Sequence, residues 1–223
     1  PVLYSPASLS AAIDTGRVES YATSLVYAGR PLQSNTDYNW TVTWWDAQGR
    51  CSGPSDAGVF HTALLGGDRD WSGVPWIAGD GNMLRRDFTL TTPPSAAHAF
   101  ISGLGWFQLF VNGHRVGTDA LSVGWTRYDK RDQYATYDVT KLLQAGDNTV
   151  GVLLGYGWRN DTAFKPRDGQ TVGPYQRMLR MQVLDTANAR LVASDASWGI
   201  TAGPIVMDSV RHVLCGGSDI EHA

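Results

Sequence analysis

Lysine and cysteine are both scarce in this 223-residue sequence, and charged residues make up only 17% of it. The three lysines, Lys130, Lys141 and Lys165, are scattered, and the formal net charge is −3. No basic stripe is therefore available to neutralise a phosphate backbone, and nucleic acid is not expected as a partner. The two cysteines, Cys51 and Cys215, lie far apart and match no zinc-ligand spacing, which argues against a disulfide framework or a zinc site.

Long apolar runs are also missing, since no stretch approaches the ~18 residues of a membrane helix. No membrane partner is expected. The first ten residues, PVLYSPASLS, lack the basic region and the apolar stretch of a signal peptide, and they begin without Met. Processing of the chain and origin as a piece of something larger both fit this start, so localisation stays open.

Aromatic residues, by contrast, reach 11% of the chain, which argues against disorder and for sheet-rich structure. The dominant period of the sequence is two. Between Tyr38 and Trp44 every second residue is apolar and the residues between are Asn or Thr, the pattern of a half-buried strand. Trp40 and Trp106, which lie inside such alternating segments, are predicted to be core residues.

Other short segments show the same strand pattern: 84–90, 97–102, 106–111, 133–139, 149–154, 178–184 and 190–194. Asn112-Gly113 is typical of a type I′ turn, because both central positions need positive φ, and it predicts a hairpin into a short strand at 114–116. Helical signal is confined to 138–146, where Asp138 or Thr140 can cap a single turn and Gly146 can end it.

Many short strands with almost no helix predict an all-β protein built as an antiparallel β-sandwich. A polar, Gly-rich stretch from Leu65 to Gly73 is typical of a domain boundary. The part before it is short for a sandwich of about 100 residues, so the first domain is expected to be incomplete at its N-terminal end. We expect a partial β-domain at 1–66, a linker at 67–82, a β-sandwich at 83–215 and an exit segment at 216–223.

No familiar catalytic motif is present in the sequence: there is no nucleophile elbow, no Walker loop and no pair of histidines around a glutamate. Glycosidases need two carboxylates that face one another across a sugar. Acidic residues are plentiful, but sequence alone cannot pair them, and Asp138 is better explained as a cap. No catalytic residue is therefore predicted in this chain.

Aromatic residues near turns are the more informative feature. Trp125, Tyr128, Tyr134, Tyr156 and Trp158 lie beside Gly, Asn, Asp and Arg. This mixture suits carbohydrate, whose C–H face stacks on a ring while its hydroxyls bond to polar side chains. Packing against the sandwich is the competing interpretation for each ring.

The segment 156–173 is long and polar, and long loops on a rigid sandwich are common recognition sites. The predicted carbohydrate-binding residues are Tyr156, Trp158, Arg159 and Asn160, together with Trp125 from an earlier turn. Asp161 and Asp168 are predicted either to bond to the sugar or to hold a calcium ion, which prefers carboxylate and carbonyl oxygens.

A series of motifs, taken in order, resembles a known family. The motifs are Arg86-Asp87-Phe88, the run from Ile101 to Gly117, Gly124-Trp125-Thr126-Arg127-Tyr128-Asp129-Lys130-Arg131, the run from Tyr134 to Thr140, and Leu154-Gly155-Tyr156-Gly157-Trp158. Together they resemble the N-terminal β-sandwich module of bacterial-type α-L-rhamnosidases. Upstream, Asp14 to Ser20, Val26 to Gly29, Tyr38 to Val42 and Phe60 to Thr62 resemble later strands of the fibronectin-III-like domain that precedes this module.

This resemblance implies a noncatalytic carbohydrate-binding or scaffold region with a jelly-roll-like sandwich. In such inverting glycoside hydrolases a downstream (α/α)₆ barrel carries the acidic catalytic residues, and this chain stops before any such barrel. Expected partners are L-rhamnose or a rhamnose-containing glycan and a downstream (α/α)₆ domain. Related modules of this sandwich type bind L-rhamnose with calcium.

The last residues favour an alternative. Ser218 and Ile220 stand where the family's exit motif, Gly-Glu-x-Tyr-Asp-Ala-Arg, has Glu and Tyr. The alternative is a free-standing sugar-binding or protein-interaction module that descends from such an enzyme by loss of its barrel. A third alternative is an enzyme with a new site on the sandwich itself.

Overall fold

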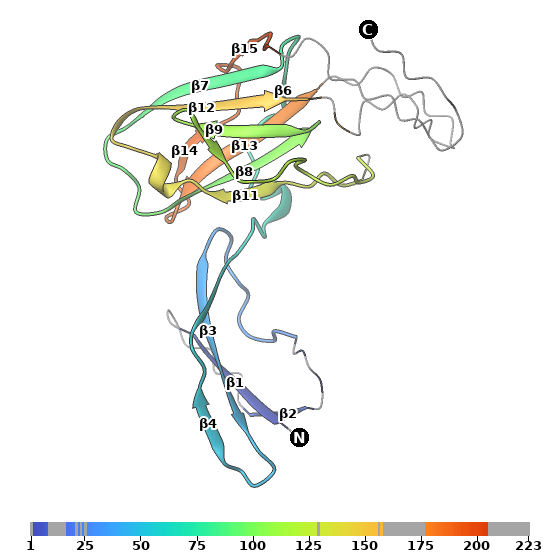
Figure 1. The fold of residues 1–223 in the computed structure, drawn as a ribbon, viewed down its shortest axis with the longest axis vertical. Coiled ribbons are helices and arrows are strands. Elements are labelled where there is room, and N and C mark those ends of the chain that lie inside the picture. The colour runs from blue at the N-terminus through green and yellow to red at the C-terminus, as the bar shows by residue number, and fades with distance from the viewer. Residues whose placement is uncertain are drawn as a thin grey trace, which may run out of the picture. The chain divides into compact units, whose positions relative to one another are not determined.

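In the residues that it describes, the computed structural model contains strands and two single-turn helices, and the chain divides into two compact units between Trp71 and Ser72 (Figure 1). It describes residues 2–8 (backbone), 17–20, 22, 24, 26–128, 130–155, 157 and 177–204. The division falls inside the segment predicted as a linker at 67–82. Within the described residues, no helix is long or apolar enough to cross a membrane.

Unit 1 is built on one antiparallel sheet of five strands. Its elements are β1 (Val2–Ser8), β2 (Val18–Ser20), β3 (Asp37–Trp45), β4 (Cys51–Pro54), β5 (Gly58–His61) and the 3₁₀ turn η1 (Gly67–Arg69). The strand order is β2-β1-β3-β4, and β5 pairs with the start of β3. The strand predicted from Tyr38 to Trp44 is confirmed as β3.

The prediction that Trp40 is a core residue is wrong. Its side chain is 44% exposed, and that of Trp44 on the same face is 46% exposed. The Trp40 ring lies over Gly58, its partner on β5, where a Cβ would come within 2.6 Å of the ring. Alternation identifies a strand but not the layer that covers its apolar face, and the described residues of unit 1 form only one sheet.

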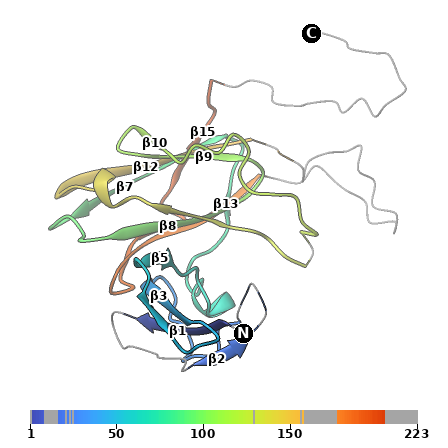
Figure 2. The same ribbon diagram turned by 60° about the horizontal axis from the view of Figure 1, so that its bottom comes forward.

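Unit 2 is an antiparallel sandwich of two sheets, seen as two layers in Figure 2. Its elements are β6 (Ile77–Ala78), β7 (Met83–Leu90), β8 (Ala97–Leu104), β9 (Phe107–Val111), β10 (His114–Val116), β11 (Ala135–Asp138), η2 (Thr140–Leu142), β12 (Gly146–Leu154), β13 (Met178–Asp185), β14 (Arg190–Ala193) and β15 (Gly199–Thr201). One sheet has the order β10-β9-β12-β7-β15 and the other β11-β8-β13-β14, with β6 on β13. The all-β antiparallel sandwich is confirmed, and its jelly-roll-like connectivity stays a prediction.

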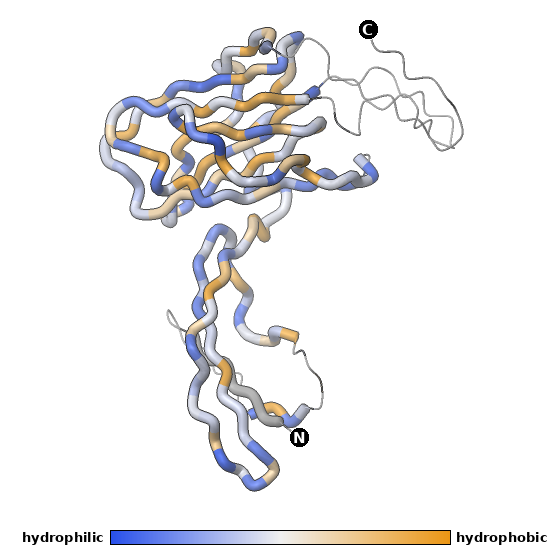
Figure 3. Tube along the Cα trace, viewed as in Figure 1, coloured by the Kyte–Doolittle hydropathy of each residue, from blue (hydrophilic) through white to orange (hydrophobic). Residues whose placement is uncertain are grey.

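The core of unit 2 lies between these sheets. Leu109, Val111 and Val150 from one sheet and Ile101 and Met181 from the other are at most 1% exposed. The strands of this unit alternate apolar and polar residues, as Figure 3 shows by colour. Full burial of each such side chain contributes about 1.5–3 kcal/mol. Trp106, predicted to be core, lies one residue before β9 and is half-buried.

The hairpin predicted at Asn112-Gly113 is confirmed. Asn112 has φ +51° and Gly113 φ +81°, and the chain returns from β9 into β10. The predicted single turn is η2, and the Asp138 carboxylate accepts hydrogen bonds from the Thr140 N–H (2.9 Å) and hydroxyl (2.6 Å). These hydrogen bonds lower the pKa of Asp138. Gly146, at φ +87°, opens β12.

Residues 72–75, which we call the entry strap, are held to unit 2 through their backbone carbonyl groups. The Arg180 Nε donates to the Val74 carbonyl (2.7 Å), the Ser194 hydroxyl to the Pro75 carbonyl (2.7 Å) and an Arg190 Nη to the Ser72 carbonyl (3.0 Å). The strap continues into β6, which pairs with β13. These residues of the predicted linker are therefore anchored on the sandwich.

Candidate functional site

The longest loop in the described part of unit 2 joins β10 to β11, and of its residues only Asp129 lies outside those that the structure describes. We call residues 117–134 the Trp125 loop. Loops of this length without secondary structure of their own are uncommon in compact domains and often carry function. The hydrogen bonds along this loop decide how its exposed side chains are presented.

The first part of the loop is fixed against β11. Gly117 has φ +76° and lies against the Tyr137 ring, where a Cβ would come within 2.6 Å of a ring carbon. The Tyr137 hydroxyl donates to the Asp119 carboxylate at 2.9 Å, and Arg115 donates to the Asp119 carbonyl at 2.6 Å. Burial, together with the neighbouring Asp119 carboxylate, raises the pKa of Tyr137, so this hydroxyl remains a donor at neutral pH.

Side-chain hydrogen bonds hold the two arms of the loop to each other and to the sandwich. The Gln133 side-chain oxygen accepts from the Gly124 N–H (3.1 Å), and the Gln133 carbonyl accepts from the Ser102 hydroxyl of β8 (2.7 Å). Ser122 is buried and donates to the Phe107 carbonyl of β9 at 3.4 Å. The arms of the loop are thus tied to both sheets.

The tip of the loop closes on itself. The Arg127 carbonyl accepts hydrogen bonds from the backbone N–H groups of Lys130 and Arg131, each at 2.8 Å. The Thr126 hydroxyl donates to the Arg131 carbonyl at 2.6 Å. The three basic side chains at this tip are exposed. The backbone of the tip is therefore held independently of any ligand.

Trp125 lies between the tied arms and the closed tip, and it is the predicted binding residue that the structure describes. Its side chain is 61% exposed, and Leu121 in the same loop is 58% exposed. An indole ring on a fixed backbone can stack on an apolar face, and the neighbouring polar and charged groups can bond to hydroxyls. The packing interpretation, in which the ring fills the sandwich, does not fit this exposure.

The other predicted residues are placed differently. Tyr134 packs edge-on against Phe100, with ring centroids 6.2 Å apart, which fits packing for this ring. Tyr128 is half-buried in the tip. The remaining predicted binding and calcium residues lie outside the described residues: Tyr156, Trp158, Arg159, Asn160, Asp161 and Asp168. Their roles stay predictions.

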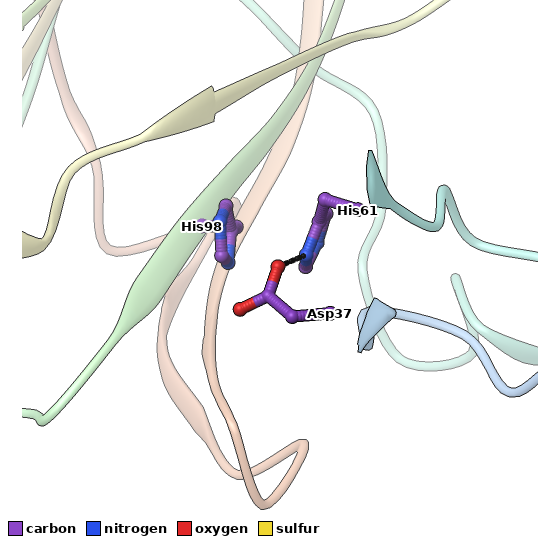
Figure 4. A group of neighbouring side chains, drawn as sticks. All are labelled: Asp37, His61 and His98. Atoms are coloured by element: carbon purple, nitrogen blue, oxygen red, sulfur yellow. Dashed lines mark hydrogen bonds and ion pairs between the residues drawn. The ribbon is translucent and has the colours of Figure 1, made fainter. Parts of the chain in front are cut away.

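Sequence analysis did not anticipate the contact between Asp37 and His61 in unit 1, which Figure 4 draws as a dashed line. The His61 Nδ1 lies 2.8 Å from an Asp37 carboxylate oxygen, and the two residues are direct partners across β5 and β3. The pairing of these strands brings together residues 24 positions apart, and no sequence pattern marked that pairing in advance. The pair lies at the end of the ladder between β3 and β5.

Comparison with known proteins matches both units. The family profile described as the α-L-rhamnosidase N-terminal domain matches residues 92–212, and a profile described as a Rha78A-like N-terminal immunoglobulin domain matches residues 5–66. The second match names an immunoglobulin domain, whereas a fibronectin-III-like domain was expected. The two types share the sandwich architecture.

Related proteins from two bacteria share the name α-L-rhamnosidase. A protein of Formosa agariphila named α-L-rhamnosidase is 28% identical over 234 residues, covering 88% of this chain and 24% of its own length. One of Streptomyces avermitilis with the same name is 34% identical over 144 residues, covering 61% of this chain and 14% of its own. The chain thus spans a quarter or less of the length of these relatives.

Solved structures agree in fold. The α-L-rhamnosidase from Dictyoglumus thermophilum superposes with a TM-score of 0.75 at 29% identity, over 91% of this chain and 26% of that one. The enzyme from Aspergillus terreus gives 0.72 at 26% identity, over 91% and 25%. Since the first profile covers more than half of the sequence, the chain belongs to the α-L-rhamnosidase N-terminal domain family.

Proposed function

We propose that this chain is a noncatalytic region of an α-L-rhamnosidase-like glycoside hydrolase, and that its Trp125 loop binds L-rhamnose or a rhamnose-containing glycan. The match to an N-terminal domain family and the chain's share of its relatives' length support the noncatalytic part. In this proposal the hydrolytic residues belong to a further domain, of the (α/α)₆ type, in the complete protein. The single observation that carries the binding part is the exposure of Trp125 on a hydrogen-bonded loop.

The chemistry of the loop suits a pyranose sugar. The indole face of Trp125 can stack on the C–H groups of a pyranose ring, and the side chains of the loop tip can bond to its hydroxyls. Aromatic stacking with two or three solvated hydrogen bonds corresponds to a Kd on the order of 10⁻⁴ M, about 5 kcal/mol. In this proposal Tyr156, Trp158, Arg159 and Asn160 extend the contact surface.

Calcium belongs to the same proposal. Asp161 and Asp168 have the carboxylate oxygens that calcium prefers. Both residues lie outside those that the structure describes. If calcium takes part, a chelator weakens sugar binding. The following experiment distinguishes sugar binding from a scaffold role without sugar binding.

The test is calorimetric titration of the whole chain with L-rhamnose. The expected result is binding near 10⁻⁴ M that Trp125→Ala weakens at least tenfold, while Trp44→Ala, which removes a similarly exposed ring from unit 1, leaves it unchanged. Because Trp125 is mostly exposed, its loss should not produce the ~3–5 kcal/mol destabilisation of a buried aromatic. Absence of binding by the parent protein, or equal binding by Trp125→Ala, contradicts the proposal.

A further inference from the structure

A second surface feature, in unit 1, has the composition of a small-molecule site. It is a shallow depression of about 350 Å³ between the segment before β3 and the turn after β5. Its lining residues are Leu32, Ser34, Leu65, Gly66, Arg69 and Asp70. The volume is at the lower end of the ~300–1,000 Å³ typical of ligand pockets. We call it the Asp70 pocket.

Hydrogen bonds hold the carboxylate of Asp70 in place in this pocket. The Ser34 hydroxyl donates to Asp70 Oδ2 at 2.7 Å, and the Gly66 N–H donates to the same oxygen at 2.8 Å. The Ser34 oxygen in turn accepts from the Leu65 N–H at 2.8 Å. A Cβ on Gly66 would collide with the other carboxylate oxygen of Asp70, so a larger residue at this position would displace the carboxylate. The acceptor is thus fixed before any ligand arrives.

Arg69 supplies donors next to this acceptor. Its side chain is exposed, and among the described residues its guanidinium makes one long hydrogen bond, from Nε to the Gly66 carbonyl at 3.5 Å. A guanidinium offers five N–H donors in a fixed fork. Leu32 and Leu65 add apolar surface to the same wall, and Leu65 is 53% exposed.

We propose that the Asp70 pocket binds a neutral polyhydroxylated ligand, the pyranose ring of a monosaccharide or of one residue in a glycan. A hydroxyl is both donor and acceptor, so neighbouring hydroxyls can donate to Asp70 and accept from Arg69. The two leucines face the C–H groups of the ring. A simple anion meets the Asp70 carboxylate and a simple cation meets the Arg69 guanidinium, so the pair disfavours simple ions of either sign. This site lies in the other unit from Trp125 and does not depend on the function proposed above.

The test uses the whole chain carrying Trp125→Ala, so that the loop does not contribute. Saturation-transfer NMR is recorded with L-rhamnose, D-galactose and D-glucose, each at concentrations up to tens of millimolar. At least one sugar should show saturation transfer with a Kd on the order of 10⁻³ M. Arg69→Ala, added to this background, should weaken that binding at least tenfold, and Leu65→Ser should weaken it as well. Arg50→Ala is the matched control, because Arg50 is an exposed arginine of the same unit that pairs with Asp46.

The outcomes separate the two sites. Loss of all sugar binding in Trp125→Ala overturns the Asp70 pocket and leaves the loop proposal standing. Binding that survives Trp125→Ala and disappears with Arg69→Ala establishes the pocket, and the loop is then judged by whether Trp125→Ala alone removes the tighter binding near 10⁻⁴ M. Binding that neither Arg69→Ala nor Leu65→Ser changes overturns the pocket. Arg69 is exposed, so its replacement is expected to leave the thermal melting temperature unchanged. If Arg69→Ala does lower the melting temperature, the sugar affinity of Leu65→Ser decides whether the pocket binds.

Discussion

Replacement of Asn148 by alanine should destabilise unit 2 more than any surface substitution near it. The Asn148 side chain is 2% exposed and makes four hydrogen bonds. Its amide nitrogen donates to the Gln144 (2.8 Å) and Gly146 (3.0 Å) carbonyls. Its oxygen accepts from the Gln144 N–H (3.0 Å) and the Asn112 side chain (2.9 Å). This residue therefore ties the turn before β12 to the β9–β10 hairpin.

The magnitude follows from these contacts. Each hydrogen bond contributes about 1 kcal/mol net, and a partner left buried without water loses about 1–3 kcal/mol. Four bonds to partly buried groups give a loss of about 3–4 kcal/mol for Asn148→Ala. With a urea m-value of about 2 kcal/mol/M, the unfolding midpoint should fall by about 1.5–2 M.

The assay is urea unfolding of the whole chain followed by tryptophan fluorescence, with m compared between variants. Asp147→Ala is the control, because that neighbouring side chain is exposed and bonds only to Thr89 at 3.0 Å among the described contacts. It should change stability by less than about 0.5 kcal/mol. A loss below about 1 kcal/mol for Asn148→Ala at unchanged m would refute the view that this network fixes the turn.

Three further predictions concern activity, boundaries and pH. The whole chain should release no aglycone from an aryl α-L-rhamnoside above the buffer rate, and turnover abolished by an Asp substitution would contradict the noncatalytic proposal. Fragment 72–223 should melt cooperatively, whereas 1–66 should not, because so short a chain with one described sheet buries too little surface; circular dichroism melts decide. The hydrogen bonds from Thr140 lower the pKa of Asp138 in the folded state. Their contribution to the free energy of unfolding is therefore fully present above the unfolded-state pKa of about 3.9, and it is lost as the pH falls through the lower pKa of the folded state. Asp138→Asn should reduce the loss of unfolding free energy between pH 5 and 2, measured by urea unfolding. The same pH dependence in the variant and the parent protein would argue against this role of Asp138.

Local chemistry explains what could be predicted from the sequence. The period of two located β3, β7, β8 and β13, because neighbouring side chains on a strand point to opposite faces whatever surrounds it. The Asn112-Gly113 turn was equally predictable, because few residues accept positive φ at both positions. Strand boundaries differed from the predicted ones by one to three residues, because the end of a strand depends on where its last hydrogen bond to the neighbouring strand forms.

Features that depend on distant contacts were not predictable. The exposure of Trp40 reflects which layer covers a face, and alternation contains no information about that. In the candidate site, Trp125 was found as an aromatic near a turn, but the bonds that fix its loop join Ser102 to Gln133 across 31 positions. The Asp70 pocket was missed for the same reason, since Ser34 and Asp70 are 36 positions apart.

The entry strap has an implication for how freely the chain before the sandwich can diverge. Its three hydrogen bonds to the sandwich are accepted by the backbone carbonyls of Ser72, Val74 and Pro75, a group that every amino acid possesses. The side chains of Ser72 and Pro75 are exposed, whereas the buried Val74 has to match the sandwich surface and Gly73, at φ +71°, favours glycine. Most residues that lead into this module, or the whole domain before it, can therefore change during evolution. Arg180, Arg190 and Ser194 can still donate to the same backbone carbonyls.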